Sequence, residues 1–122
     1  MIELQEIKMS TSIRWLLSYS KNDQHELARC YIEVMQEDLL NLKICIDSSG
    51  NPIAILHKIK GGLSMIGATE MHQQAKEVLF SLRHSQAGPN VDLAAFIIKL
   101  KLSTLELQKW RDKNSDITDI SP

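Results

Sequence analysis

The sequence has few of the residues that stabilise small extracellular scaffolds. Only two cysteines, Cys30 and Cys45, occur among its 122 residues, which is too few for a disulfide framework. They are isolated from each other by 15 positions, and both fall within an apolar helical pattern. A disulfide between them is one possibility, but buried thiols in a reducing cytoplasm are the favoured interpretation.

The sequence also lacks an excess of charge and any long apolar run. A net charge of −1 gives no general reason to bind nucleic acid or an acidic membrane. No apolar run reaches the ~20 residues that span a bilayer. The segment from Met1 to Leu4 has an acid and no signal-peptide pattern. We therefore expect a cytoplasmic location.

Glycine and proline are sparse and mark breaks between helical patterns. Breaks are expected at residues 18–22, 48–52 and 85–90, and apolar residues between them recur at helical spacing. No sustained strand pattern occurs. The sequence predicts a single all-α domain over 1–122, an antiparallel four-helix bundle with a short additional N-terminal helix. We place that helix at about 12–18, the bundle at about 23–113 and a frayed C-terminal tail at 114–122.

Local signals refine these expectations. The second helix should begin with Asn22 or Asp23 as N-cap, and the third with Asn51 as N-cap before Pro52. Glu37 and Asp38 are interpreted as the solvated side of the second helix. Trp15 and Trp110 are interpreted as lids at the ends of the bundle rather than as stacking platforms for bases.

The most informative segment is His57-Lys58-Ile59-Lys60-Gly61-Gly62-Leu63-Ser64-Met65-Ile66-Gly67. An α-helix advances ~100° per residue, so one sector less than ~100° wide presents an imidazole, an ammonium and small residues. This sector contains His57, Lys60, Gly61, Ser64 and Ala68. A second sector, roughly opposite, is the aliphatic stripe of Leu56, Ile59, Leu63 and Ile66.

This surface suits a phosphoryl group carried on a side chain. Imidazole can attack phosphorus through a ring nitrogen, and its pKa keeps much of it unprotonated near neutral pH. Lys60, three residues after His57, can neutralise the phosphoryl oxygens. Gly61 removes the next side chain at a cost of roughly 1 kcal/mol, which suggests close approach by a partner. Gly67 fits a helix C-cap.

The segment resembles the signature of histidine phosphotransfer (HPt) domains. That signature has a histidine, Lys-Gly at the third and fourth following positions and glycine at the tenth, matched by His57, Lys60, Gly61 and Gly67. The chain looks most like the C-terminal HPt domain of an unorthodox hybrid sensor kinase. This resemblance implies either a free-standing cytoplasmic protein or the cytoplasmic part of a membrane-bound kinase. With helix pattern included the resemblance covers residues 23–113, but its specific part is this segment alone.

The resemblance implies a phosphorelay intermediate rather than an autonomous enzyme. His57 would take a phosphoryl group from a receiver-domain aspartate and pass it to a response-regulator aspartate. This domain would need no cofactor of its own, because the partner receiver would supply Mg²⁺. We expect the docking patch to include Lys58, Ser64 and Ala68, and the chain to be a monomer. The sequence has no P-loop, so it should not use ATP itself.

One position departs from the family pattern. Many members carry Glu or Gln at the twenty-second position after the histidine, where it can bond to the imidazole Nδ1, whereas this chain has Leu79. The group that orients the imidazole is therefore missing, or is supplied by Gln74, Glu77 or water.

Other interpretations remain open from the sequence. His57 can be an ordinary solvated or packed histidine. The chain can be a non-catalytic helical docking module for a signalling partner, or a structural bundle with no partner. The other histidines, His25, His72 and His84, lack the spacing of a helical two-histidine metal site, so we expect no metal.

Overall fold

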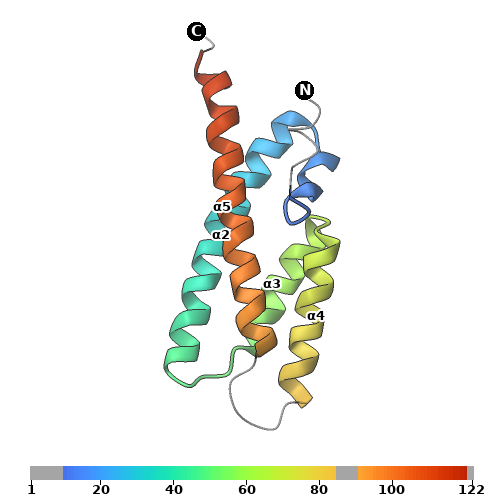
Figure 1. Cartoon of the computed structure of the whole chain (residues 1–122), viewed down its shortest axis with the longest axis vertical. Coiled ribbons are helices and arrows are strands. Elements are labelled where there is room, and N and C mark those ends of the chain that lie inside the picture. The colour runs from blue at the N-terminus through green and yellow to red at the C-terminus, as the bar shows by residue number, and fades with distance from the viewer. Residues whose placement is uncertain (1–9, 85–90, 121–122) are drawn as a thin grey trace.

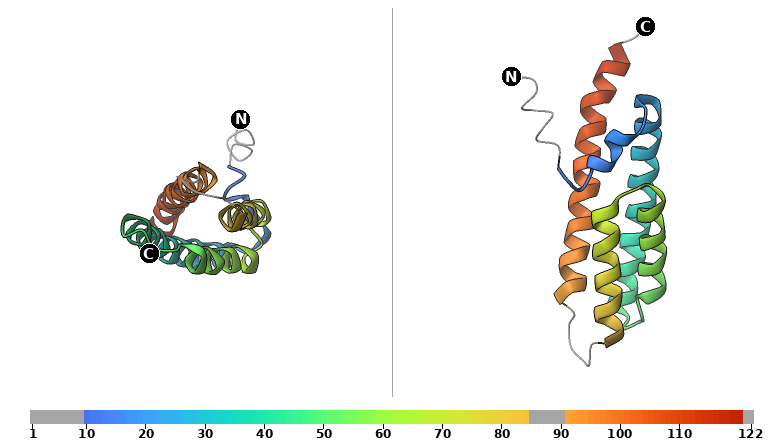
Figure 2. Two further views of the ribbon diagram at one scale, coloured as in Figure 1. Left: turned by 90° about the horizontal axis from the view of Figure 1, so that it is seen from below. Right: turned by 90° about the vertical axis from the view of Figure 1, so that its right-hand side faces the viewer.

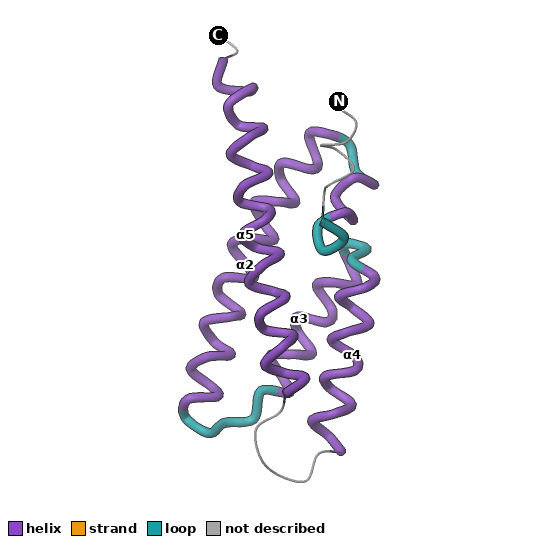
Figure 3. Tube along the Cα trace, in the orientation of Figure 1, coloured by secondary structure: helices purple, strands orange, loops and turns teal. Residues whose placement is uncertain are grey.

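The computed structural model describes residues 10–84 and 91–120, and side chains within these ranges except those of residue 91 and residues 115–120. It is helical throughout, with no strand in these ranges (Figure 3). A short 3₁₀ helix, η1 (Arg14–Ser18), precedes α2 (Lys21–Asp47), α3 (Ile53–Met65), α4 (Thr69–His84) and α5 (Val91–Ile120). None of the helices in the described ranges has both the length and the apolar content needed to cross a membrane.

The long helices run side by side and alternate in direction (Figure 1). The closest neighbours are α3 with α4, and α2 with α5, while η1 packs against α2. Seen end-on, α5 and α3 lie at diagonally opposite corners (Figure 2). The arrangement is compatible with a helical bundle.

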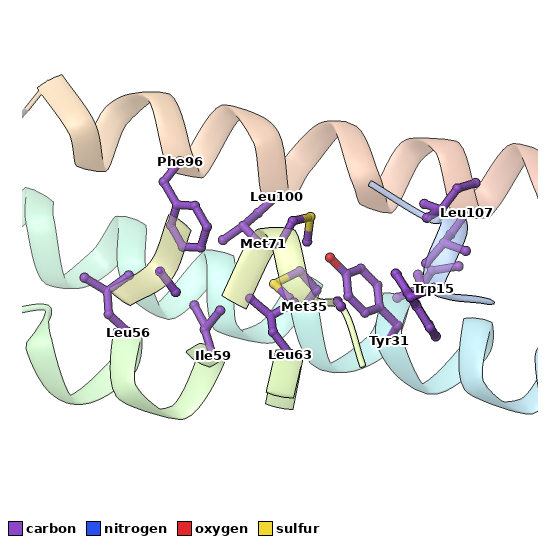
Figure 4. Close-up of a cluster of buried hydrophobic side chains, with 14 of the residues drawn as sticks. Trp15, Tyr31, Met35, Leu56, Ile59, Leu63, Met71, Phe96, Leu100 and Leu107 are labelled. Carbon is purple, nitrogen blue, oxygen red and sulfur yellow. The ribbon is translucent and has the colours of Figure 1, made fainter. Parts of the chain in front are cut away.

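Buried apolar side chains from η1 and all four long helices form one core (Figure 4). Leu16, Leu56 and Leu100 are completely buried, and the indole of Trp15 lies against the ring of Tyr31 with centroids 5.6 Å apart. Trp110 is partly buried at the same end of the molecule as Trp15, against the ring of His25. The burial of Leu56, Ile59 and Leu63 in this core confirms the face predicted for α3.

The two helix starts differ in how well the sequence predicts them. The prediction for α2 is wrong, because Ser20 is the N-cap and its hydroxyl accepts a hydrogen bond from the Asp23 amide. The serine lies outside the apolar pattern but supplies the oxygen that an N-cap needs. At α3 the N-cap is Pro52, one residue later than the predicted Asn51, although the carboxamide oxygen of Asn51 accepts a hydrogen bond from the Ile53 amide at 3.0 Å.

The C-terminal expectation also needs correction. The backbone of α5 is helical through Ile120, so residues 114–120 continue the helix that was expected to have ended. The predicted break at residues 85–90 lies outside the described residues.

The positions of the two cysteines along one helix decide whether they can form a disulfide. Cys30 and Cys45 are both free, half-buried and part of α2. Fifteen residues of α-helix separate them by about 22 Å, whereas the Cα atoms of a disulfide lie within about 7 Å. A disulfide within the folded chain is therefore excluded.

Candidate functional site

Helix α3 buries one side and presents His57 on the other. Leu56, Ile59 and Leu63 are at most 2% exposed, and they fix the rotation of the helix against the core. The next residue after Leu56 is therefore turned outward, and His57 is exposed. The expected separation of an aliphatic stripe from an imidazole-bearing face is confirmed.

The imidazole of His57 meets a side chain that sequence reasoning did not identify. Nη2 of Arg83, in the last turn of α4, lies 2.5 Å from Nε2 of His57. A guanidinium has only donors, so it donates and Nε2 must accept. The ring nitrogen that faces Arg83 is therefore unprotonated, and a neutral ring carries its proton on Nδ1.

The tertiary arrangement brings Arg83 and His57 together. They are 26 positions apart, and only the antiparallel packing of α4 on α3 makes them neighbours. A residue three or four positions away on the same helix can be found from spacing, but this contact depends on the register between two helices. The sequence signal that could have found it is a cation in the last turn of α4, where Arg83 and His84 also suit the helix dipole.

The position expected to orient the imidazole is part of the core. Leu79 is 3% exposed, which explains why no polar residue stands there. Gln74 and Glu77 instead line a shallow hollow beside Asp92 and Lys99, between α4 and α5. In the described part of the chain neither of them bonds to His57, so the contact from Arg83 is the orienting interaction that the structure contains.

Lys60 lies one turn after His57 on the same helix and is half-buried. Within the described residues it forms no ion pair shorter than 4 Å. The whole of α3 contains no acidic residue. The ammonium of Lys60 is therefore not committed to a carboxylate of its own helix.

Gly61 and Gly62 are exposed within a regular helix, and nothing in the structure requires them to be glycine. A Cβ added at either position meets no atom within 4 Å, and neither residue has a positive φ. Glycine in a helix interior costs roughly 1 kcal/mol relative to alanine. The open space above these residues, rather than packing inside the chain, is what glycine provides.

Gly67 has the conformational role expected for a helix end. Its φ of 81° is in the left-handed region, its amide donates to the Ser64 carbonyl, and the Ala68 amide donates to the Leu63 carbonyl. These two bonds form a Schellman motif. Because α3 ends at Met65, the chain has turned before Ala68, which is only 5% exposed. The prediction that Ala68 shares the exposed face is therefore wrong, whereas Ser64 is exposed.

Lys58 is anchored to a carboxylate that was wrongly assigned to solvent. Nζ of Lys58 donates to Oδ1 of Asp38 at 2.7 Å, and the Asp38 side chain is 4% exposed while that of Lys58 is 60% exposed. The interpretation of Asp38 as solvated is wrong because the packing of α3 covers it. Glu37 is exposed, as expected. Lys58 thus links α2 to α3 immediately beside His57.

His25 and His84 have contacts of their own, away from His57. The ring of His25 packs on Trp110, and Nδ1 of His84 donates to the Phe80 carbonyl at 2.8 Å. Among the described residues no group of three His, Cys, Asp or Glu could hold a metal ion. The site therefore offers an exposed imidazole, a guanidinium in contact with its Nε2, an ammonium one turn away and a glycine-lined approach.

Comparison of the chain with protein-family models, with curated proteins and with solved structures gives no match.

Proposed function

We propose that this chain is a histidine phosphotransfer domain with the antiparallel four-helix bundle of that family. In this proposal His57 accepts a phosphoryl group from the aspartate of a receiver domain and passes it to the aspartate of a response regulator. The observation that carries the proposal is the contact between the exposed His57, which lies in the segment that resembles the family signature, and Arg83 of α4. This contact supports the proposal because a cation lies beside an unprotonated ring nitrogen of His57.

The proposed reaction is a direct exchange of one bond for another. The lone pair of Nε2 attacks phosphorus, the P–N bond forms, and the P–O bond to the aspartate breaks as the carboxylate leaves. Arg83 must move off Nε2 for this attack, and its guanidinium then pairs with the phosphoryl oxygens. Lys60, one turn after His57 on α3, adds a second positive charge.

The receiver in this proposal supplies the Mg²⁺ and the acidic pocket, and this domain supplies the nucleophile. Gly61 and Gly62 leave space for the receiver surface, and Ser64 and the exposed stem of Lys58 border it. The acid-free helix α3 complements an acidic pocket. We further propose that the domain works in the cytoplasm, where receivers are found.

The test is transfer from receiver domains carrying labelled aspartyl phosphate to the parent protein and to His57→Gln. We expect an acid-labile, base-stable label on the parent and none on the variant. His72→Gln and His84→Gln are matched controls that should retain the label. The unfolding free energy of His57→Gln should stay within about 1 kcal/mol of the parent, because the side chain is exposed. Equal labelling of His57→Gln and parent contradicts the assignment.

A docking module without phosphoryl chemistry is the second candidate, because it accounts for the exposed glycine pair without using the imidazole of His57. Both candidates need open space above Gly61 and Gly62. They differ in their dependence on the imidazole. If no receiver labels the parent, and partner binding is the same for the parent and His57→Gln, the docking module is the better description.

A further inference from the structure

Helix α5 carries apolar side chains on the side that faces away from the core. Ile98, Leu102 and Leu105 are 57%, 52% and 52% exposed. Their spacing of four and three residues places them within about 60° of one another on the helix surface. The buried residues of the helix, including Phe96, Leu100 and Leu107, lie on the opposite side. We call Ile98, Leu102 and Leu105 the outer stripe.

One flank of the outer stripe carries charges that suit a copy of itself, and the other flank carries Lys101. Lys99 and Glu106 lie on the same flank, about 100° and 80° from Ile98. Lys99 precedes Leu102 by three residues and Glu106 follows it by four. Two copies of α5 that run in opposite directions and cross at Leu102 would therefore bring Lys99 of each copy beside Glu106 of the other. In each copy Oε1 of Glu106 also accepts a hydrogen bond from Oγ of Ser12 at 3.0 Å.

The same reversal also matches the apolar residues. Ile98 lies four residues before Leu102 and Leu105 three residues after it. In the antiparallel pair Leu102 meets its own equivalent on the two-fold axis, and Ile98 meets Leu105 of the second copy. Farther out, the exposed Ala94 faces the stem of Lys109, a small residue opposite a long one. A two-fold interface must be self-complementary in this way.

From this register we propose that the outer stripe of α5 is a homodimer interface, in which two copies of this chain pack α5 against α5 in antiparallel orientation. The proposal departs from the expectation of a monomer and does not depend on phosphoryl transfer. It leaves His57 accessible, because α3 lies diagonally opposite α5 (Figure 2). Each dimer would present two separate α3 faces to partners.

The first test is the mass of the protein in solution as a function of concentration, measured by sedimentation velocity. We expect a concentration-dependent rise toward twice the 13.8 kDa of the chain. A single 13.8 kDa species up to about 1 mM, the weak end of measurable association, overturns the proposal.

The second test uses variants that separate the stripe from general exposure. Leu102→Glu places two carboxylates together on the axis and should weaken dimerisation at least about tenfold. The matched control is Leu17→Glu, because Leu17 is a similarly exposed leucine on η1 at 57%. An equal effect of the two variants, or none from Leu102→Glu, shows that the stripe is not the interface.

The third test addresses the register. Lys99→Glu should weaken the dimer about two- to fivefold, as expected for an exposed ion pair. The double variant Lys99→Glu with Glu106→Lys should restore the parent affinity, because each new Glu again meets a Lys of the second copy. A dimer that the double variant weakens as much as the single one overturns the antiparallel register.

Discussion

At the residue scale, Arg83 is the side chain whose removal should most directly affect the imidazole of His57 without disturbing the core. Arg83 is exposed and contacts Nε2, so Arg83→Ala should change the unfolding free energy by less than about 0.5 kcal/mol. In the proposed reaction the guanidinium of Arg83 pairs with the phosphoryl oxygens, and a hydrogen bond to a charged group contributes about 1.5–3 kcal/mol. We therefore expect phosphoryl transfer to His57 to slow about 10- to 100-fold, measured by single-turnover transfer from a charged receiver.

Two further variants make this prediction specific to the guanidinium. Lys76 is an exposed cation on the same helix, and Lys76→Ala should transfer at the parent rate. Arg83→Lys keeps the charge without the planar fork and should fall between parent and Arg83→Ala. Parent-like transfer by Arg83→Ala would show that the contact with His57 is incidental.

The residues of the site also show where single-sequence reasoning ends. His57, Lys60, Gly61 and Ser64 could be placed on one face because they share a helix, and helical geometry relates them directly. Arg83 could not, because its position relative to His57 depends on how α4 packs against α3. Asp38 was misassigned for the same reason, since the carboxylate is covered by a different helix.

At the scale of the element, the glycines of α3 should respond to substitution with opposite signs. Gly61→Ala and Gly62→Ala meet no neighbouring atom in a helical backbone, so each should stabilise the fold by up to about 1 kcal/mol. Gly67→Ala forces a side chain into the left-handed region at φ 81° and should destabilise the fold by about 1 kcal/mol. Chemical denaturation of the three variants checks both signs.

The same variants separate stability from docking. If receivers approach over Gly61, then Gly61→Ala should transfer more slowly than the parent although it is more stable. Gly67→Ala should be less stable than the parent, but it leaves the exposed face of α3 that carries His57 and Gly61 unchanged. Destabilisation by Gly61→Ala would contradict the open environment inferred for that position.

Local sequence patterns predicted some features of the helices and missed others. The stripe of Leu56, Ile59 and Leu63 was predictable because it depends on neighbours in the chain. The start of α3 was predicted to within one residue, with Pro52 rather than Asn51 as the N-cap. The N-cap of α2, Ser20, lies outside the apolar pattern, so that pattern did not locate the start of the helix. The position of Ala68 was missed because the left-handed turn at Gly67 ends the helix before it.

At the scale of the whole molecule, Tyr31 joins α2 to α5 through a buried polar contact that should respond to alkaline pH. Its hydroxyl lies 2.6 Å from that of Ser103, and burial raises the pKa of Tyr31 to about 12 from an ordinary 10.0. Below pH 10 the tyrosine is protonated in both folded and unfolded states, and its full contribution is present. Between pH 10 and 12 the unfolded state loses the proton first, so stability falls.

A shift of about two units corresponds to a loss of roughly 2–3 kcal/mol by pH 12. Lysines titrate in the same range, so the measurement is the difference between the parent and Tyr31→Phe in urea unfolding from pH 8 to 12. The parent should lose more stability than the variant over this range. If the unfolding free energies of the parent and Tyr31→Phe fall in parallel with pH, the pKa of Tyr31 is not higher in the folded state than in the unfolded state.

The short helix η1 should behave as part of the same core rather than as an appendage. Leu16 is 0% exposed and Leu17 is 57% exposed, although they are adjacent. Leu16→Ala should therefore cost about 2–5 kcal/mol through lost burial and a cavity, and Leu17→Ala less than about 0.5 kcal/mol. The hydroxyl of Tyr19 also donates to the Ile66 carbonyl at 2.8 Å, which ties the segment after η1 to the end of α3.

Denaturant unfolding of the two alanine variants, followed separately by tryptophan fluorescence and by far-ultraviolet circular dichroism, tests this view. Trp15 lies in η1 and Trp110 in α5, whereas circular dichroism reports all helices. If η1 belongs to the cooperative unit, the two signals coincide in Leu16→Ala at a lower midpoint. An early fluorescence transition with an unchanged circular dichroism midpoint would mean that η1 detaches alone, and that the four long helices hold the core without it.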